Sequence, residues 1–205
     1  MSIKREIPEV NAGSMADIAF LLLIFFLVTT TLKTDEGFDR LLPPKEPGPE
    51  IELNERNVLR VNINSDNKLM VEDNVVDITS LRDLTKAFID NGGMTINGND
   101  YCAYCKGNRY KSSSDNPIKA IVFLSHKRET TYGFYIMIQN ELIGAYNELR
   151  NREAKRLFNQ GYVQMEEEYH NQNTHLERKV ILKKQIKKIQ ELYPQKIIEN
   201  EVFNN

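Results

Sequence analysis

A long run of apolar residues near the beginning of the sequence constrains this chain most. Residues 18–28 are apolar without interruption, and Ala16, three threonines and Leu32 extend the run at its ends. Counted from Gly13 to Leu32 the stretch is about 20 residues, or about 30 Å of helix, which matches the hydrocarbon core of a bilayer. We therefore predict a transmembrane helix over residues 13–32. It lacks the small-residue cleavage site of a signal peptide, so we expect it to remain as an anchor.

One ionisable residue, Asp17, lies inside this stretch. An aspartate in the bilayer costs about 2.5–3.5 kcal/mol on insertion scales, so its presence there points to a function. The alternative is structural, because Ser14 and Asp17 have the spacing of a capping box at a helix start. A span that began after Asp17 would be only about 23 Å long, which favours a carboxyl group within the membrane. The hydroxyls of Thr29, Thr30 and Thr31 are candidates for a water path to it, although threonines in spans often bond to their own helix.

The sequence from Met15 reads M-A-D-I-A-F-L-L-L-I-F-F-L-V-T-T, with a short polar tail before it and a linker containing Leu-Pro after it. This stretch resembles the ExbD/TolR family of biopolymer-transport proteins, in which a single N-terminal span carries one aspartate, Asp17 here. The resemblance is specific over residues 14–32 and extends in architecture to about residue 158. It implies an inner-membrane protein that crosses once, with a cytoplasmic N-terminus and a periplasmic C-terminal domain.

The resemblance also implies a function, that of a proton-motive-force-coupled subunit of an inner-membrane motor. Two copies of the span would sit inside a ring of ExbB/TolQ-like multi-span subunits, and Asp17 would accept and release protons. The periplasmic domain would pass the work to a TonB-like or TolA-like partner for outer-membrane transport. The membrane and a second copy of the chain are thus expected partners, and peptidoglycan is a further candidate. The alternative is a bitopic scaffold that anchors a periplasmic binding domain without proton coupling, with Asp17 only a cap.

The composition fits one modest domain held by such an anchor. The chain has 205 residues, of which 27% are charged, and its mean hydropathy of −0.49 describes a mainly aqueous protein. A formal net charge of −2 gives no case for nucleic-acid binding. The sequence holds no phosphate-binding glycine loop, nucleophile elbow or H-E-x-x-H motif, so we expect neither an enzyme nor a bound cofactor or metal.

We divide the chain by composition into a cytoplasmic tail (1–12), the span (13–32), a proline-rich periplasmic linker (33–50), a periplasmic domain (51–158) with a loop insertion (91–117), and a C-terminal helical extension (159–205). The linker holds four of the seven prolines. Its segment Leu41, Leu42 and Pro43 is apolar. We interpret this segment either as a hydrophobic foot near the membrane or as a docking segment that adds a strand to an open sheet edge.

The sequence pattern of the periplasmic domain predicts an α+β fold, a small two-layer sandwich of helices on a sheet. We expect strands at 58–63, 69–71, 75–76 and 118–124, one helix that Ser80 opens as a capping box, and a second helix from Thr130 or Thr131 to about Phe158. The second helix is too long for a domain of this size, so its distal half should pack on something else. In the extension, residues 174–192 predict a basic helix stopped by Pro194, whose charged side is either simply solvated or a contact for an acidic partner or the cell wall.

Cys102 and Cys105 form a C-x-x-C motif within the loop insertion. Zinc normally needs four ligands, but no second C-x-x-C exists and the three histidines are distant and unpatterned. In an oxidising periplasm the simple interpretation is a local disulfide that pins the loop. Redox activity and metal binding are the alternatives.

Overall fold

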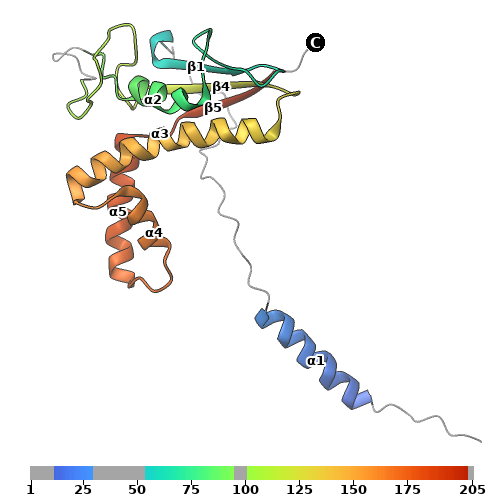
Figure 1. Ribbon diagram of the computed structural model, residues 1–205. Helices are drawn as coiled ribbons and strands as arrows, with labels where there is room; N and C mark the ends of the chain where they lie inside the picture. Colours follow the sequence, from blue (N-terminus) through green and yellow to red (C-terminus); the bar gives the residue numbers. More distant parts are fainter. Residues whose placement is uncertain (1–11, 30–53, 95–100, 203–205) are drawn as a thin grey trace, which may run out of the picture. The chain divides into compact units, whose positions relative to one another are not determined.

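The computed structural model describes residues 12–29, 54–94 and 101–202 (Figure 1). The chain divides into two compact units, residues 1–43 and residues 44–205, and each is described here by itself. Residues 30–32 of the predicted span and the whole linker segment from Leu41 to Pro43 lie outside the described residues.

In the first unit, the structure describes the helix α1 (Ala12–Thr29). The large apolar side chains that the structure describes from Met15 to Phe26 are exposed, with Ile18 at 59%, Phe20 at 61% and Phe25 at 59%. Over the residues that the structure describes, no helix combines the length and the apolar character needed to cross a membrane.

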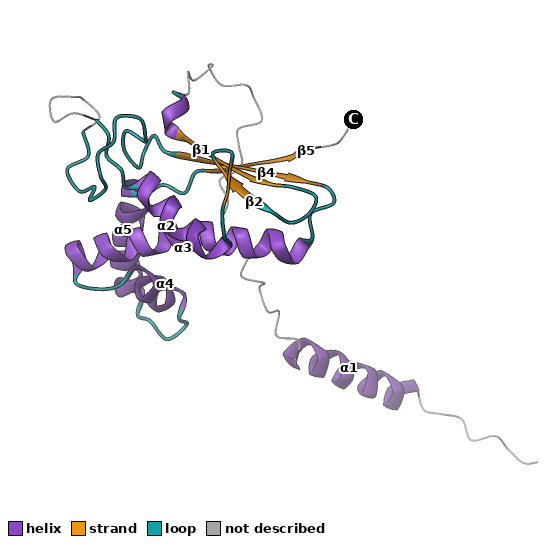
Figure 2. Cartoon of the chain, turned by 45° about the horizontal axis from the view of Figure 1, so that its top comes forward, coloured by secondary structure: helices purple, strands orange, loops and turns teal. Residues whose placement is uncertain are grey.

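The second unit is built on a five-stranded sheet in the order β3-β2-β1-β4-β5 (Figure 2). The strands are β1 (Val58–Ile63), β2 (Leu69–Val71), β3 (Asn74–Val75), β4 (Ile121–Lys127) and β5 (Ile197–Val202). Strand β1 is antiparallel to β2 and parallel to β4, and β5 is parallel to β4. The register places Val61 between Val71 on one side and Leu124 on the other, so the most apolar positions of three strands meet at the centre.

Two helices, α2 (Ile78–Ile89) and α3 (Tyr132–Phe158), cover one face of this sheet (Figure 1). Alternation of side chains along β1 turns Leu59, Val61 and Ile63 toward the helices. They pack there with Leu81 of α2 and Leu142 of α3 in the main core. The α+β class predicted from the sequence is therefore confirmed.

The distal half of α3 packs on two further helices, α4 (Tyr162–His170) and α5 (Leu176–Leu192), away from the sheet (Figure 1). A second apolar core joins the three helices. It consists of Ala154, Tyr162, Met165, Leu182, Ile186 and Ile189. The expectation that the end of α3 packs on something other than the sheet is confirmed, and the packing partner is the C-terminal part of the same chain.

The helix α2 begins earlier than predicted. Its first residue is Ile78 and Asp77 precedes it, so Ser80 lies inside the helix and the predicted capping box is wrong. Ile78 packs against the main core. The burial of this side chain adds apolar contact to the first turn and so favours the earlier start.

The strand β4 begins three residues later than predicted, at Ile121. Asn116 closes a turn just before it: the carbonyl oxygen accepts from the backbone N–H of Ala120 at 3.0 Å, and the side-chain oxygen accepts from the N–H of Lys119 at 2.9 Å. These bonds use backbone groups that a strand over 118–120 would need for its ladder.

The C-terminal extension is not only helical, and in this respect the prediction is wrong. After Pro194 the chain returns to the sheet as β5, which pairs with β4 over six residues from Ile197 to Val202. The extension therefore contributes an edge strand as well as the helices α4 and α5.

Candidate functional site

Asp17 lies in the second turn of α1. The helix begins at Ala12, two residues before Ser14, so the capping-box interpretation, which needs Ser14 directly outside the helix, does not hold. Asp17 is also the one ionisable residue among the eighteen of α1. Helical spacing places Phe20, Leu21 and Ile24 on the same side of the helix as Asp17. The carboxyl group thus lies at the N-terminal end of an apolar helical surface.

The threonine hydroxyl that the structure describes is not close to this carboxyl. Oγ1 of Thr29 donates to the carbonyl of Phe25 at 2.7 Å. This threonine therefore bonds to the backbone of its own helix, which is the alternative to a water path. Thr29 is twelve residues beyond Asp17, which corresponds to about 18 Å along the helix axis. Thr30 and Thr31 lie outside the described residues, so the proposed water path stays a prediction.

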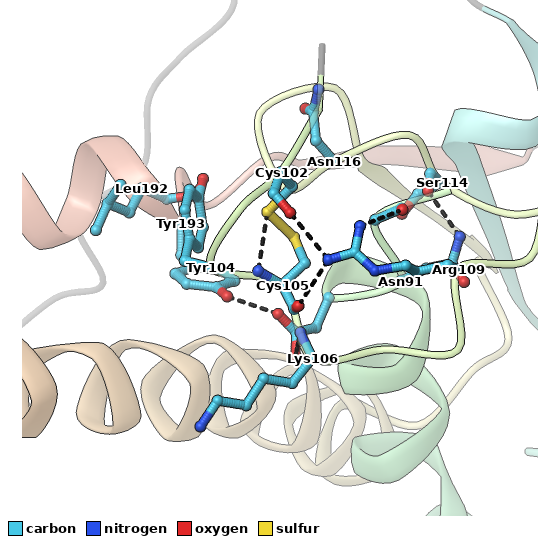
Figure 3. The surroundings of a disulfide bond; sticks show 12 residues. Asn91, Cys102, Tyr104, Cys105, Lys106, Arg109, Ser114, Asn116, Leu192 and Tyr193 are labelled. Atoms are coloured by element: carbon cyan, nitrogen blue, oxygen red, sulfur yellow. Dashed lines mark hydrogen bonds between the residues drawn. A yellow bond between two sulfur atoms is a disulfide. The ribbon is translucent and has the colours of Figure 1, made fainter. Parts of the chain in front are cut away.

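Cys102 and Cys105 are joined by a disulfide in the loop that leads from α2 to β4 (Figure 3). Both cysteines are buried, and the backbone N–H of Cys105 donates to Sγ of Cys102 at 3.1 Å. The guanidinium of Arg109 donates to the carbonyls of Cys102 and Cys105 at 3.2 and 3.3 Å and to that of Gly92 at 3.3 Å. Gly92 has φ of +64°, and a Cβ there would lie 2.8 Å from Cβ of Cys105, so the turn requires glycine.

The same loop is held against the C-terminal part of the chain. The hydroxyl of Tyr104 donates to the carbonyl of Leu192 at 2.9 Å, and the rings of Tyr104 and Tyr193 meet edge to face with centroids 5.5 Å apart. Burial raises the pKa of Tyr104 to about 12, so the hydroxyl keeps its proton and remains a donor at neutral pH. The loop insertion and the C-terminal extension therefore contact each other directly. We call this contact region, with the polar groups around it, the joint.

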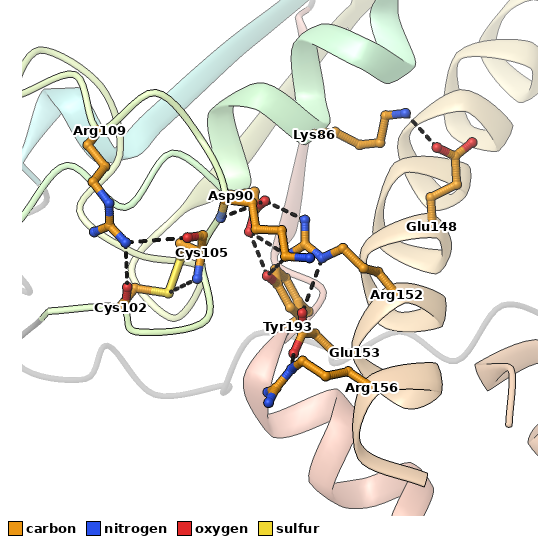
Figure 4. A network of polar contacts seen from close by, with 11 residues as sticks. Lys86, Asp90, Cys102, Cys105, Arg109, Glu148, Arg152, Glu153, Arg156 and Tyr193 are labelled. Carbon is orange, nitrogen blue, oxygen red and sulfur yellow. Dashed lines mark hydrogen bonds and ion pairs between the residues drawn. A yellow bond between two sulfur atoms is a disulfide. The ribbon is translucent and has the colours of Figure 1, made fainter. Parts of the chain in front are cut away.

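Asp90, directly after α2, is the centre of this joint (Figure 4). Its buried carboxylate accepts from both terminal nitrogens of Arg152 at 2.6 and 2.9 Å, from the hydroxyl of Tyr193 at 2.6 Å and from the N–H of Lys106 at 3.2 Å. The Tyr193 hydroxyl in turn accepts from Arg152 at 2.7 Å. Four segments that are distant in the sequence thus meet at one carboxylate.

A second buried carboxylate, Glu153, balances the charges of the joint. It accepts from Nε of Arg152 at 3.1 Å and from Nε of Arg156 at 2.6 Å (Figure 4). The hydrogen bond to Asp90 raises the pKa of Arg152, and burial followed by the bond to Asp90 raises the pKa of Tyr193. Both groups keep their protons at neutral pH. The joint therefore holds segments of the chain together through hydrogen bonds between charged and neutral groups.

Sequence patterns indicated the cysteine pair but missed this joint. Asp90, Arg152 and Tyr193 belong to three separate segments, and nothing local to any of them signals the others. The one local signal is the i, i+3 spacing of Glu153 and Arg156, which pairs charges on a helix surface.

Across the described ranges, no group of three or more His, Cys, Asp and Glu side chains could hold a metal ion. A pocket of about 510 Å³ lies between β1, β2, α2 and the loop insertion, and its lining is mostly apolar, with Leu59, Val71 and Phe88 among its residues. Asp17 therefore remains the strongest candidate for a functional residue in the described parts of the chain.

A family model described as "Biopolymer transport protein ExbD/TolR" matches residues 3–147. The matched part includes α1 with Asp17, strands β1 to β4, helix α2 and the first half of α3, and it leaves out α4, α5 and β5. No curated protein sequence matches the chain. Because the family match covers well over half of the 205 residues, the chain belongs to the ExbD/TolR family, whose members are inner-membrane components of energy-transducing biopolymer transport.

Proposed function

We propose that this protein is the proton-motive-force-coupled subunit of an inner-membrane motor of the ExbB–ExbD or TolQ–TolR type. In this proposal α1 and the residues after it form the single membrane span. The N-terminus is cytoplasmic and the second unit lies in the periplasm. Two copies of the span sit in a ring of ExbB/TolQ-like subunits, and the periplasmic unit passes work to a TonB-like or TolA-like partner.

The observation that carries the proposal is the position of Asp17. It is the one ionisable residue of an otherwise apolar helix, and it lies in the second turn, where it cannot serve as the cap of the helix that the structure shows. The described large apolar side chains of α1 are exposed, and a helix that is apolar all round needs lipid or other helices as its surroundings. An ionisable residue in such a helix is a functional candidate by default.

Proton coupling follows from the chemistry of a lone carboxyl group in an apolar environment. Such a group is costly when charged and much less so when neutral, so protonation changes how easily the helix moves past its neighbours. A proton that enters from the periplasmic side would neutralise Asp17, and its release on the other side would restore the charge. Thr29, Thr30 and Thr31 belong to this proposal as polar residues at the periplasmic end of the span.

Replacement of Asp17 by Asn tests the proposal, because asparagine keeps the shape of the side chain but does not titrate. Energy-dependent transport should be lost while membrane insertion and assembly with the ring persist. In a bitopic scaffold without proton coupling, this variant would keep its function.

A further inference from the structure

The helix α5 has two different sides. One side is buried in the second core through Leu182, Ile186 and Ile189. The other side faces solvent along the length of the helix. The helix α5 packs on the distal half of α3, and its N-terminal part lies away from the sheet, while its last residue, Leu192, packs against the main core (Figure 1).

The solvent side of α5 carries large apolar residues at its N-terminal end. Leu176 is 81% exposed, Val180 51% and Ile181 49%. Leu176 and Val180 are one turn apart, so they lie on the same face of the helix, with Ile181 beside them. Such exposed aliphatic side chains, gathered on one turn and a half of a helix, indicate a surface that meets another apolar phase.

Lysines continue the same face toward the C-terminal end of α5. The exposed ones are Lys183, Lys184, Lys187 and Lys188. Lys187 lies 4.0 Å from Glu191, whereas the other three have no acidic partner among the described residues. With six basic and two acidic residues, the helix has a net charge of +4 at neutral pH. The helix therefore has a buried apolar side and an outer side that combines lysine and aliphatic groups with two exposed glutamates, Glu177 and Glu191.

We propose that the outer face of α5, formed by Leu176, Val180, Ile181, Lys183, Lys184, Lys187 and Lys188, docks on the surface of an anionic phospholipid bilayer. The aliphatic residues would enter the boundary between headgroups and acyl chains. The lysines would extend their ammonium groups to the lipid phosphates, as long cationic side chains do at an interface.

The kind of residue on this face favours lipid over a protein partner. Protein interfaces are enriched in arginine and aromatic residues and depleted in lysine. The one arginine of α5, Arg178, is instead held within the unit by Glu168 and Gln160. A cell-wall polymer of sugars and short peptides would satisfy the lysines, but it offers no hydrocarbon to receive Leu176 and Val180. An anionic bilayer satisfies both kinds of side chain.

The connection to α1 permits such docking. Residues 30–53 join α1 to the second unit, and a chain of that length can span at most about 80 Å. This limit keeps the second unit near the membrane if α1 is anchored there, as the proposed function holds. Attraction of lysines to anionic lipid acts only within about a Debye length, so α5 must come close to the membrane. By keeping the second unit near the membrane, the tether would raise the local concentration of lipid around α5.

The test uses the full chain in nanodiscs of two compositions, one of zwitterionic phosphatidylcholine and one with added anionic phosphatidylglycerol. An amine-reactive acylating reagent is applied, and mass spectrometry follows the rate at each lysine. We expect Lys183, Lys184, Lys187 and Lys188 to react on the order of fivefold or more slowly in anionic discs, and the protection to vanish in 1 M salt. Lys68 and Lys111, exposed on other elements, should react equally in both discs.

Two charge-matched variants sharpen the test. In K184E/K187E the remaining lysines of the face should lose their protection, whereas K68E/K111E changes the net charge equally and should leave it intact. Equal reactivity of the face in both discs, with the chain incorporated in both, overturns the docking on lipid but not the proposed anchor. Binding to anionic discs alone supports the docking and overturns the anchor. Binding to neither kind overturns both.

Discussion

At the scale of single residues, the Tyr193 hydroxyl is a neutral group that bridges two charged side chains of the second unit. It donates to Asp90 and accepts from Arg152, while its ring contacts Tyr104. Tyr193→Phe keeps the ring and removes only the hydroxyl. Because hydrogen bonds to charged groups are worth more than neutral ones, we expect this variant to lower the free energy of unfolding by about 1–3 kcal/mol.

Urea unfolding of the full chain in detergent, followed by circular dichroism, measures this loss. Tyr132→Phe is the matched control, because Tyr132 is 77% exposed at the first turn of α3. An unchanged midpoint in the Tyr193 variant would show that Asp90 and Arg152 hold the joint without the hydroxyl.

The pair formed by Glu168 and Arg178 predicts a dependence of stability on pH. Glu168 accepts two bonds of 2.8 Å from Arg178 and one of 2.9 Å from Gln160, and these bonds lower its pKa from 4.5 to about 2. A carboxyl whose pKa is lowered on folding stabilises the fold above its unfolded pKa and loses this contribution as the pH falls toward the folded pKa. The melting temperature should therefore fall between pH 5 and pH 2.

Glu168→Gln isolates this contribution from that of other carboxyl groups. The variant should melt lower than the parent at pH 6, and the difference should shrink toward pH 2. Both side chains of the pair are more than a third exposed, at 39% for Arg178 and 34% for Glu168, so the effect should be small and weakened by salt. A difference that stays constant over this pH range would contradict the assignment.

At the scale of elements, the sequence predicts best what local periodicity controls. Thr131 precedes α3 and Phe158 ends it, as the spacing of its apolar residues indicates. The strands over 58–63 and 69–71 follow in the same way from alternation. The helix α4 and the strand β5 were missed. Strand β5 holds two glutamates in six residues, and pairing with the neighbouring β4 stabilises it more than its own composition does.

The same reason explains which site residues were predictable. Asp17 and the pair Cys102 and Cys105 are marked by their immediate neighbours in the sequence. The joint of Asp90, Arg152 and Tyr193 depends on contacts between segments up to 103 residues apart, which no local pattern encodes.

The linker segment of Leu41, Leu42 and Pro43 carries a prediction at this scale. It lies outside the described residues, and we propose that it adds as a strand to an edge of the sheet of its own or its partner copy's domain. The sheet offers edges at β3 and β5. A short tether gives an effective concentration of roughly a millimolar, so even weak docking would be populated.

Replacement of Leu41 and Leu42 by Ser should then deregulate energised transport without affecting membrane insertion. NMR spectra of the parent and of this variant would show the docked state directly, through shifts at the edge strands. If the edge-strand resonances are the same in both, the segment is a spacer only.

At the scale of the whole molecule, the chain combines a family domain with an addition of its own. The family match ends at residue 147, within α3, yet Arg152 and Tyr193 beyond it donate to Asp90 within it, and the Leu192 carbonyl accepts from Tyr104 of the disulfide loop. The added helices are thus fixed to the domain by buried charges and an apolar core, so they should move with it as one body. Work received through the linker would reach α4 and α5 through this joint.

The central claim is that Asp17 couples this body to the proton gradient. The most direct measurement compares the parent, Asp17→Asn and Asp17→Glu for two properties: co-purification with an ExbB/TolQ-like partner, and transport that depends on the proton gradient. We predict that all three chains assemble, that Asn abolishes the transport, and that Glu, which still titrates, retains part of it. Full transport by the Asn variant, with normal assembly, would contradict the claim.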